Sequence, residues 1–182
     1  MPYQVINNFL NDREVEDLST FLDESKFWES FSDNKKTDRE AFNFTLKQDE
    51  LPDFLAEFKS SKHNLYHFVA IRTHKSGSID EHVDFALGEV LIHKQPGMFI
   101  SNPETIVYYE TIDSDMKGGE LIVEHNFFKP TENTAVILAP GTPHAVSAIE
   151  KTVKPRVVLV CERYRILSKY LKGINTPEYK KG

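Results

Sequence analysis

Two histidines and one aspartate are the residues of this chain whose types and spacing can bind a metal ion. His82 and Asp84 are separated by one residue in the segment His82-Val83-Asp84. In an extended chain the side chains at positions i and i+2 point to the same side, so this imidazole and this carboxylate can reach one ion while Val83 faces away. His144 lies sixty residues after Asp84, directly after the turn sequence Pro-Gly-Thr-Pro, and is the candidate for a third ligand.

Two histidines and one carboxylate on one face of a metal ion leave further coordination positions open. This arrangement is typical of non-haem iron(II) oxygenases, in which a co-substrate and O₂ bind the ion together. The His-x-Asp pattern alone is weak evidence, and on spacing alone it favours an ordinary strand end at the surface. The other histidines show no ligand spacing and are typical of surface or hydrogen-bonded side chains; they are His63, His67, His74, His93 and His125.

The composition is that of a globular protein. The 182 residues suit one well-packed domain, and 40% of them are hydrophobic and 27% charged. The single cysteine, Cys161, lies in the apolar run RVVLVCERY, so we predict a buried, reduced core residue rather than a nucleophile. No apolar run approaches the ~18 residues that span a bilayer. The start of the chain lacks the basic and apolar segments of a secretory signal, so we predict no membrane segment and a cytoplasmic location.

The net charge of −6 is unevenly distributed. Residues 1–150 carry 13 Lys/Arg and 26 Asp/Glu, a charge of −13, whereas residues 151–182 carry 9 Lys/Arg and 2 Asp/Glu, a charge of +7. We expect the basic C-terminal segment to pack on the acidic body. A nucleic-acid partner is disfavoured, because no aromatic or glycine pattern of a nucleic-acid-binding module accompanies the basic residues.

The N-terminal part of the sequence predicts helices. A short strand over residues 3–6 comes first. Asn11 then has the type and place of a helix N-cap, and Glu14 three residues later completes a capping box. Apolar residues follow at helical spacing, so we predict an amphipathic helix over residues 12–24 and a second, short helix near residues 50–60.

From about residue 64 the pattern changes to short strands separated by turns. The predicted strands are rich in Val, Ile and Tyr and cover 65–72, 105–110, 120–124, 134–138 and 156–164, with turns at 75–78, 95–97, 117–119 and 140–143. Such a series without intervening helical patterns indicates an antiparallel sandwich or jelly roll. With the helices first, the predicted class is α+β with a mainly β core.

Five motifs follow one another in the strand region. They are His82-Val83-Asp84, the strand that carries Tyr109, Gly118-Gly119-Glu120-Leu121, Pro143-His144-Ala145-Val146, and the basic start of the last strand at Lys154-Pro155-Arg156. This ordered set resembles the iron(II)/2-oxoglutarate-dependent dioxygenases, most closely their prolyl-4-hydroxylase-like branch. The resemblance covers residues 66–165, and the first strand and helix also resemble the start of that family.

The resemblance implies a distorted double-stranded β-helix (jelly roll) with N-terminal buttressing helices. We expect one domain over residues 1–182. Residues 1–64 would supply the N-terminal strand and helices, 65–165 the jelly-roll core, and 166–182 a basic C-terminal tail.

The resemblance also implies the cofactors and their ligands. Iron(II) would be held by His82, Asp84 and His144, with 2-oxoglutarate and O₂ as co-substrates. Arg156 matches the basic residue that pairs with the distal carboxylate of 2-oxoglutarate, and a planar guanidinium suits this role because it donates two parallel charged hydrogen bonds. Lys154 is the alternative, since some members use a lysine at about this place. We favour Arg156, because it leads directly into the apolar strand.

Two further residues are candidates for the co-substrate pocket. Tyr109 corresponds to a tyrosine whose hydroxyl contacts the same carboxylate. Strand alternation puts Tyr108 and Tyr109 on opposite faces, and either is a possible inward residue. Arg72 falls where relatives often have a tyrosine, and both a contact to 2-oxoglutarate or an acidic substrate and an ordinary salt bridge remain open.

The segment between the His-x-Asp motif and the Tyr109 strand, residues 85–104, is longer than in compact relatives. Its apolar stretches over 90–92 and 98–100 have strand patterning, so we predict a hairpin that turns at 95–97. Its place directly after Asp84 suggests a flap over the metal, and both a moving lid and a fixed hairpin remain open. A second departure from the family is Glu110-Thr111 after Tyr109, where relatives often have Leu-Asn.

The predicted activity is hydroxylation of an unactivated C–H bond, with succinate and CO₂ as co-products. Asp84 favours hydroxylation, because family members that halogenate lack this carboxylate. The expected substrate is an amino-acid unit, free or within a peptide or protein. One rival is a cupin-type enzyme, but cupins usually supply a His-x-His pair and this chain has none. The other is a non-catalytic jelly-roll binding module, against which the three ligands and Arg156 argue.

Overall fold

The structure is a computed structural model that describes residues 2–31, 38–75, 78–95 and 97–174. Part of the predicted turn at 75–78, Pro96 in the predicted turn at 95–97 and residues 175–182 of the predicted basic tail lie outside these ranges.

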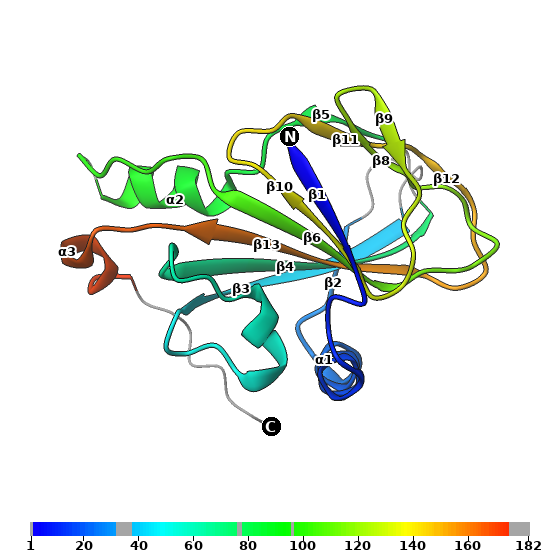
Figure 1. The fold of residues 1–182 in the computed structure, drawn as a ribbon, viewed down its shortest axis with the longest axis horizontal. Helices are drawn as coiled ribbons and strands as arrows, with labels where there is room; N and C mark the ends of the chain where they lie inside the picture. Colours follow the sequence, from blue (N-terminus) through cyan, green and yellow to red (C-terminus); the bar gives the residue numbers. More distant parts are fainter. Residues whose placement is uncertain (1, 32–37, 76–77, 96, 175–182) are drawn as a thin grey trace.

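The strands of the described chain form three antiparallel sheets (Figure 1). A seven-stranded sheet has the order β1-β10-β6-β13-β4-β3-β2. Its strands are β1 (Tyr3–Asn7), β2 (Glu29–Phe31), β3 (Asp38–Lys47), β4 (Leu65–Lys75), β6 (Glu104–Thr111), β10 (Thr134–Leu138) and β13 (Arg156–Tyr164). A four-stranded sheet has the order β5-β11-β8-β9, with β5 (Ile79–His82), β8 (Leu121–Val123), β9 (Asn126–Phe128) and β11 (His144–Val146). The pair β7 (Lys117–Gly118) and β12 (Ile149–Lys151) completes the set.

The six strands predicted outside residues 85–104 are all present, within a few residues of their predicted ends. The mainly β, antiparallel prediction is therefore confirmed. The sequence analysis missed β2 and β3, and it also missed the short strands β5, β7, β9, β11 and β12.

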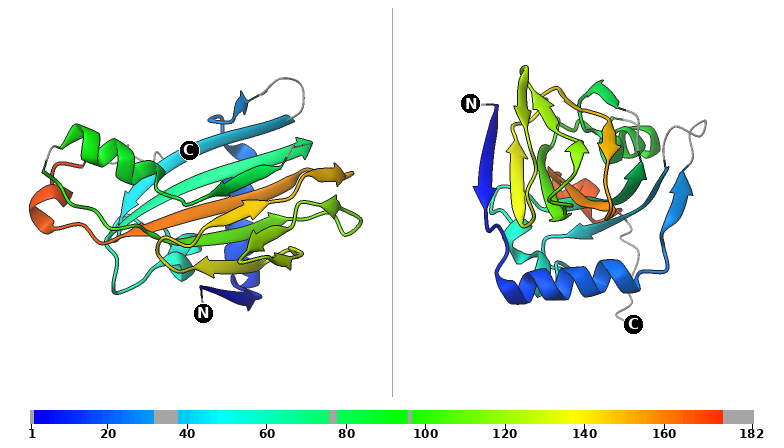
Figure 2. Two further views of the ribbon diagram at one scale, coloured as in Figure 1. Left: turned by 90° about the horizontal axis from the view of Figure 1, so that it is seen from above. Right: turned by 90° about the vertical axis from the view of Figure 1, so that its right-hand side faces the viewer.

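The large sheet is covered on both faces, and alternate residues of its strands divide between two apolar clusters. On one face Phe68, Tyr108 and Leu159 join a cluster with Leu18 and Leu22 of helix α1 (Asp12–Glu24). On the other face Val107, Tyr109 and Val158 join a cluster with residues of the four-stranded sheet. Figures 1 and 2 show α1 on one side of the large sheet and β5 and β11 on the other. We call the second face the inner face.

Helix α1 begins as the sequence predicts. Asn11 accepts a hydrogen bond from the backbone N–H of Glu14, and the Glu14 side chain accepts one from the backbone N–H of Asn11, which confirms the capping box. The second predicted helix is a 3₁₀ helix, η1 (Asp53–Phe58), whose Leu55 and Phe58 are buried in the α1 cluster.

The predicted hairpin within residues 85–104 is wrong, because this segment contains helix α2 (Ala86–Lys94). Leu87 and Leu91, four residues apart, lie on the buried side of the helix, whereas Val90 and Ile92 are exposed. The two leucines pack in one cluster with Tyr164 and with residues around helix α3 (Ser168–Leu171). A short apolar run does not by itself distinguish a strand from a helix, and here burial at helical spacing decided the outcome.

In the part of the chain that the structure describes, no helix has the length and apolar character needed to cross a membrane. Cys161 is free and buried, as predicted. Residues 166–174, from the start of the predicted tail, include Ile166 and Ile174, which are buried beside α2.

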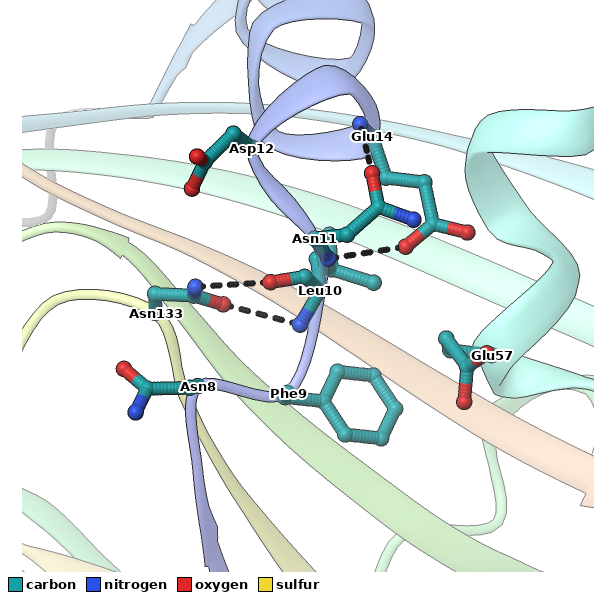
Figure 3. A pocket seen from close by; sticks show the side chains of 8 residues that line it. All are labelled: Asn8, Phe9, Leu10, Asn11, Asp12, Glu14, Glu57 and Asn133. Carbon is teal, nitrogen blue, oxygen red and sulfur yellow. Dashed lines mark hydrogen bonds between the residues drawn. The ribbon is translucent and has the colours of Figure 1, made fainter.

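Asn133 links the start of α1 to the large sheet (Figure 3). Its side-chain amide donates to the carbonyl of Leu10 and accepts from the N–H of Leu10, each at 2.9 Å. Its backbone N–H donates to the carbonyl of Tyr109 at 2.9 Å, and its φ of 53° lies in the left-handed region. Asparagine tolerates this conformation better than other residues that have a Cβ.

We expect Asn133→Ala to lower the free energy of unfolding by about 2–4 kcal/mol, because it removes the side-chain hydrogen bonds to Leu10 and Tyr108 and places alanine in a left-handed conformation. Asn133→Gly removes the same hydrogen bonds without the backbone penalty and should destabilise the protein less. Urea unfolding of both variants measures the difference. Equal stability of Asn133→Ala and the wild type would contradict this role.

Candidate metal centre

The pairing of β5 with β11 brings the predicted metal ligands together. The two strands are antiparallel, with His82 directly opposite His144, and on its other side His144 faces Val123 of β8. Asp84 follows two residues after the end of β5. The Nε2 atom of His82 lies 3.7 Å from Oδ1 of Asp84, and Nε2 of His144 lies 3.4 Å from Oδ2.

These distances fit a shared metal ion. All three ligand atoms lie within 4.8 Å of one another, and among the described residues these three form the one such group of three or more potential ligands. Two ligands at right angles, each about 2.1 Å from an ion, would be about 3 Å apart, so small rotations of the side chains suffice.

The hydrogen bonds of the two histidines leave the correct ring nitrogens free. Nδ1 of His82 lies 2.9 Å from the carbonyl of Asp80, and Nδ1 of His144 lies 3.2 Å from that of Thr142. A carbonyl can only accept, so each Nδ1 carries the proton and each Nε2 is free to bind a metal. Burial lowers the pKa of His144 below its ordinary value, which also favours the neutral imidazole that a metal requires.

Asp84 has an atom that a metal ion would satisfy. Its Oδ2 is buried and has no hydrogen-bond partner. A buried carboxylate oxygen without a donor is costly, and coordination is one of the few ways to compensate it. This oxygen, together with the two free Nε2 atoms, supports a metal site at the triad.

Arg156, the first residue of β13, is a second unsatisfied group on the inner face. The residue is 6% exposed, and its Nε has no hydrogen-bond partner. The guanidinium lies over the ring of Tyr109, 5.5 Å from the ring centre, and the buried Tyr109 hydroxyl also lacks a hydrogen-bond partner. Burial lowers the pKa of Arg156 and raises that of Tyr109, and each residue opposes the shift of the other.

No carboxylate in the described ranges forms an ion pair with Arg156. A buried cation without a partner destabilises a protein. Arg156 and Tyr109 together therefore form a cradle that an anionic group would complete, and a guanidinium suits a carboxylate best.

The apolar cluster of the inner face joins this cradle to the triad. It contains Tyr109 and Val158 beside Arg156, and Val123 and Val146 beside His144. Tyr109 is therefore the inward tyrosine, whereas Tyr108 lies in the cluster that packs against α1.

The remaining candidates lie elsewhere. Lys154 is exposed, and its backbone N–H is bonded to Asp113. Arg72 belongs to the face that packs against α1: it lies 4.2 Å from the ring centre of Trp28 and forms ion pairs at 3.5 Å with Asp23 and Glu40. These contacts favour the salt-bridge interpretation of Arg72.

Sequence reasoning missed Glu162 and Tyr164 at the end of β13. Both are buried, and both bond to the backbone at the start of α2, directly after Asp84. No local signal marked either residue, because β13 also carries Arg156 and Arg163 and Glu162 is not its one charged residue.

No protein-family model and no curated protein matches the sequence. Solved structures do match. A 2OG-Fe(II) oxygenase family protein from Burkholderia pseudomallei is 15% identical, with a TM-score of 0.58 over 90% of this chain and 85% of that one. A Pseudomonas putida prolyl-4-hydroxylase is 11% identical, with a TM-score of 0.62 over 90% and 92%. A viral collagen prolyl hydroxylase from Paramecium bursaria Chlorella virus-1 is 14% identical, with a TM-score of 0.60 over 92% and 91%.

At these identities the likeness shows the fold. The chain has the jelly-roll fold of the 2OG-Fe(II) oxygenases, as the sequence analysis predicted.

We expect the wild-type protein to bind about one Mn(II) or Co(II) ion per chain, and His144→Ala to weaken this binding strongly, because it removes one of three ligands. His125→Ala is the matched control, since His125 is an exposed histidine on the turn between β8 and β9. Calorimetric titration of the apoprotein measures both. Equal affinity in the two variants would exclude His144 as a ligand.

Proposed function

We propose that this chain is an Fe(II)- and 2-oxoglutarate-dependent oxygenase that hydroxylates an unactivated C–H bond. One observation carries the proposal: an open His-Asp-His triad on the four-stranded sheet and a buried, unpaired arginine on the inner face of the large sheet border the same apolar cluster. A metal-only site would not need the arginine, and an anion-binding site would not need the triad.

Each residue has a defined part in this reaction. His82, Asp84 and His144 would hold iron(II) and leave the opposite coordination positions open. Arg156 would bind the distal carboxylate of 2-oxoglutarate, and the Tyr109 hydroxyl would donate a further hydrogen bond to it. Bound iron, with 2-oxoglutarate and O₂, supplies the oxidising power; one oxygen atom enters the substrate and the other enters succinate, with release of CO₂.

The part of the inner face over β3 and β4 is the proposed place for the substrate. Asn43 of β3 is exposed, and Val69 and Ile71 of β4 are only partly buried, although they alternate with core residues. The register pairs Asn43 with Val69, and Val69 with Val160 of β13. An apolar floor with one amide suits a substrate that has a hydrocarbon part to be oxidised and a polar group that sets its orientation.

For the substrate we propose an amino-acid unit, free or within a peptide or protein. Support comes from the proposed site, where Asn43 offers both a donor and an acceptor to a peptide-like group. Two of the structures of similar fold are prolyl hydroxylases. Another is described as a carbocyclase from nogalamycin biosynthesis, with a TM-score of 0.59, so this fold serves other reactions as well.

The two rival functions predict different behaviour. A cupin-type enzyme would bind the metal without needing Arg156. A non-catalytic binding module would bind 2-oxoglutarate or a substrate but would form no succinate. The unpaired Arg156 argues against the first rival, and the complete triad argues against the second.

Arg156→Lys should raise the 2-oxoglutarate concentration needed for half-maximal succinate formation at least tenfold. Lysine keeps the positive charge but cannot donate the bidentate pair of hydrogen bonds to the carboxylate. Charged hydrogen bonds contribute about 1.5–3 kcal/mol, and about 1.4 kcal/mol corresponds to tenfold. Lys154→Ala, the matched control, should change this value by less than about twofold, since exposed charges contribute little. A larger effect of Lys154→Ala than of Arg156→Lys would show that Lys154 binds the distal carboxylate of 2-oxoglutarate.

Turnover gives the test of the whole proposal. The protein should form succinate from 2-oxoglutarate only with Fe(II) and O₂, and proline-containing peptides or free amino acids should stimulate the reaction and gain one oxygen atom. Mass spectrometry of the peptide and assay of succinate measure both products. Asp84→Ala should abolish both, whereas His125→Ala should keep both. If the protein binds the metal but forms no succinate in all of these conditions, a non-catalytic binding module is favoured.

A further inference from the structure

Glu162 is a buried carboxylate that the proposed chemistry does not use. It lies near the end of β13, opposite His67 of β4 and Thr105 of β6, and its side chain points to the same face as Arg156 six residues earlier. Only 2% of the residue is exposed. A charged group at such depth must be well bonded to be tolerated.

The hydrogen bonds of Glu162 go to the start of α2. Its two carboxylate oxygens accept from the backbone N–H of Ala86 at 3.0 Å and from that of Leu87 at 3.3 Å. Tyr164 donates its hydroxyl proton to Glu162 at 2.5 Å and accepts from the N–H of Gly88 at 3.2 Å. Three consecutive N–H groups of α2 are thus bonded to two side chains of β13.

Helix α2 has no cap of its own at this end. Phe85 occupies the N-cap position and makes no capping hydrogen bond. The first N–H groups of a helix have no partner within it, and the positive end of the helix dipole favours an anion. Burial raises the pKa of Glu162, and the hydrogen bonds from Tyr164, Ala86 and Leu87 oppose this rise. Glu162 therefore supplies from another strand the cap that Phe85 lacks.

The ring of Phe85 packs closely on the first turn of α2. A Cβ on Gly88 would lie 2.2 Å from the ring of Phe85, so the ring packs directly on the helix backbone. Phe85 and Tyr164 have ring centres 6.4 Å apart.

These contacts fix the backbone directly after a metal ligand. Asp84 immediately precedes the N-cap residue, and its buried Oδ2 has no hydrogen bond to orient it. The orientation of this carboxylate therefore depends on the backbone that carries it.

We propose that Glu162, with Tyr164, is a positioning residue that holds the start of α2 and thereby directs the carboxylate of Asp84 toward the metal site. The inference rests on the proposed function. In this arrangement β13 carries the anchor of 2-oxoglutarate at its beginning and the support of a metal ligand at its end. The first turn of α2 is then fixed scaffold, not the hinge of a lid.

Three variants separate positioning from charge. Glu162→Gln keeps the shape but leaves one of the two N–H groups without an acceptor. Glu162→Asp keeps the charge but is one methylene too short to reach both. Tyr164→Phe removes the hydroxyl alone. Tyr66→Phe is the control, since its buried hydroxyl bonds to Ser60 in the 59–64 loop and not to α2.

The measurements are Co(II) affinity of the apoprotein by absorbance titration and amide hydrogen exchange at residues 86–88. Changes in groups that orient metal ligands typically weaken binding about 10–100-fold. We expect Glu162→Gln and Glu162→Asp each to lose about tenfold or more, Tyr164→Phe to lose less, and Tyr66→Phe to keep wild-type affinity. Exchange at 86–88 should accelerate in the first three variants, while amides of β13 stay protected.

The outcomes distinguish the two proposals. If the wild type binds no Co(II), the proposed metal site itself fails. If the wild type binds and Glu162→Asp keeps its affinity while Glu162→Gln loses it, Glu162 acts through charge and the positioning proposal is overturned. It is also overturned if all variants bind like the wild type. Should Glu162→Gln fail to fold, Tyr164→Phe decides: affinity equal to that of Tyr66→Phe contradicts the proposal.

Discussion

The antiparallel pairing of β5 with β11 is the constraint on which the candidate site depends. Paired residues in neighbouring strands have Cα atoms about 4.5–5.5 Å apart, so the pairing of His82 with His144 brings the two imidazoles to one place although 62 positions separate them. The turn before His144 is equally restricted. Gly141 has a φ of 74°, and a Cβ there would lie 2.8 Å from the side chain of Asn102. A one-residue slip would turn one histidine to the other face and dismantle the site.

The site is built at a cost in stability. Nε of Arg156, the Tyr109 hydroxyl and one oxygen of Asp84 are buried without the hydrogen bonds that such groups need. Selection for stability alone would replace a buried, unpaired arginine with an apolar residue. Binding of an anion and a cation would satisfy all three groups, so the ligated protein should be considerably more stable than the apoprotein. Strand β13 joins both halves of this site, with Arg156 near its start and Glu162 near its end.

Much of this arrangement could be predicted from the sequence. The His-x-Asp spacing alone was weak, and the triad was indicated by the resemblance that the five ordered motifs carry. The apolar run after Arg156 favoured it over Lys154, which is exposed. Alternation separated Tyr108 from Tyr109 but could not say which faced inward, because both are buried, in different clusters. Helix α2 was missed because its short apolar run fits both the periodicity of a helix and that of a strand. Strand β3 was missed although Phe42, Phe44 and Leu46 alternate visibly. The role of Glu162 depends on α2 and on long-range packing, so no local pattern could have revealed it.

The central claim is that one metal ion at the triad of the four-stranded sheet and one molecule of 2-oxoglutarate at Arg156 of the large sheet are bound together. A crystal structure of the protein grown anaerobically with Mn(II) and 2-oxoglutarate, with anomalous diffraction to locate the metal, tests it most directly. The account predicts manganese bound to His82, Asp84 and His144, and the distal carboxylate of 2-oxoglutarate bound to Arg156 and Tyr109. Manganese at other residues, or 2-oxoglutarate that leaves Arg156 unpaired, would contradict it.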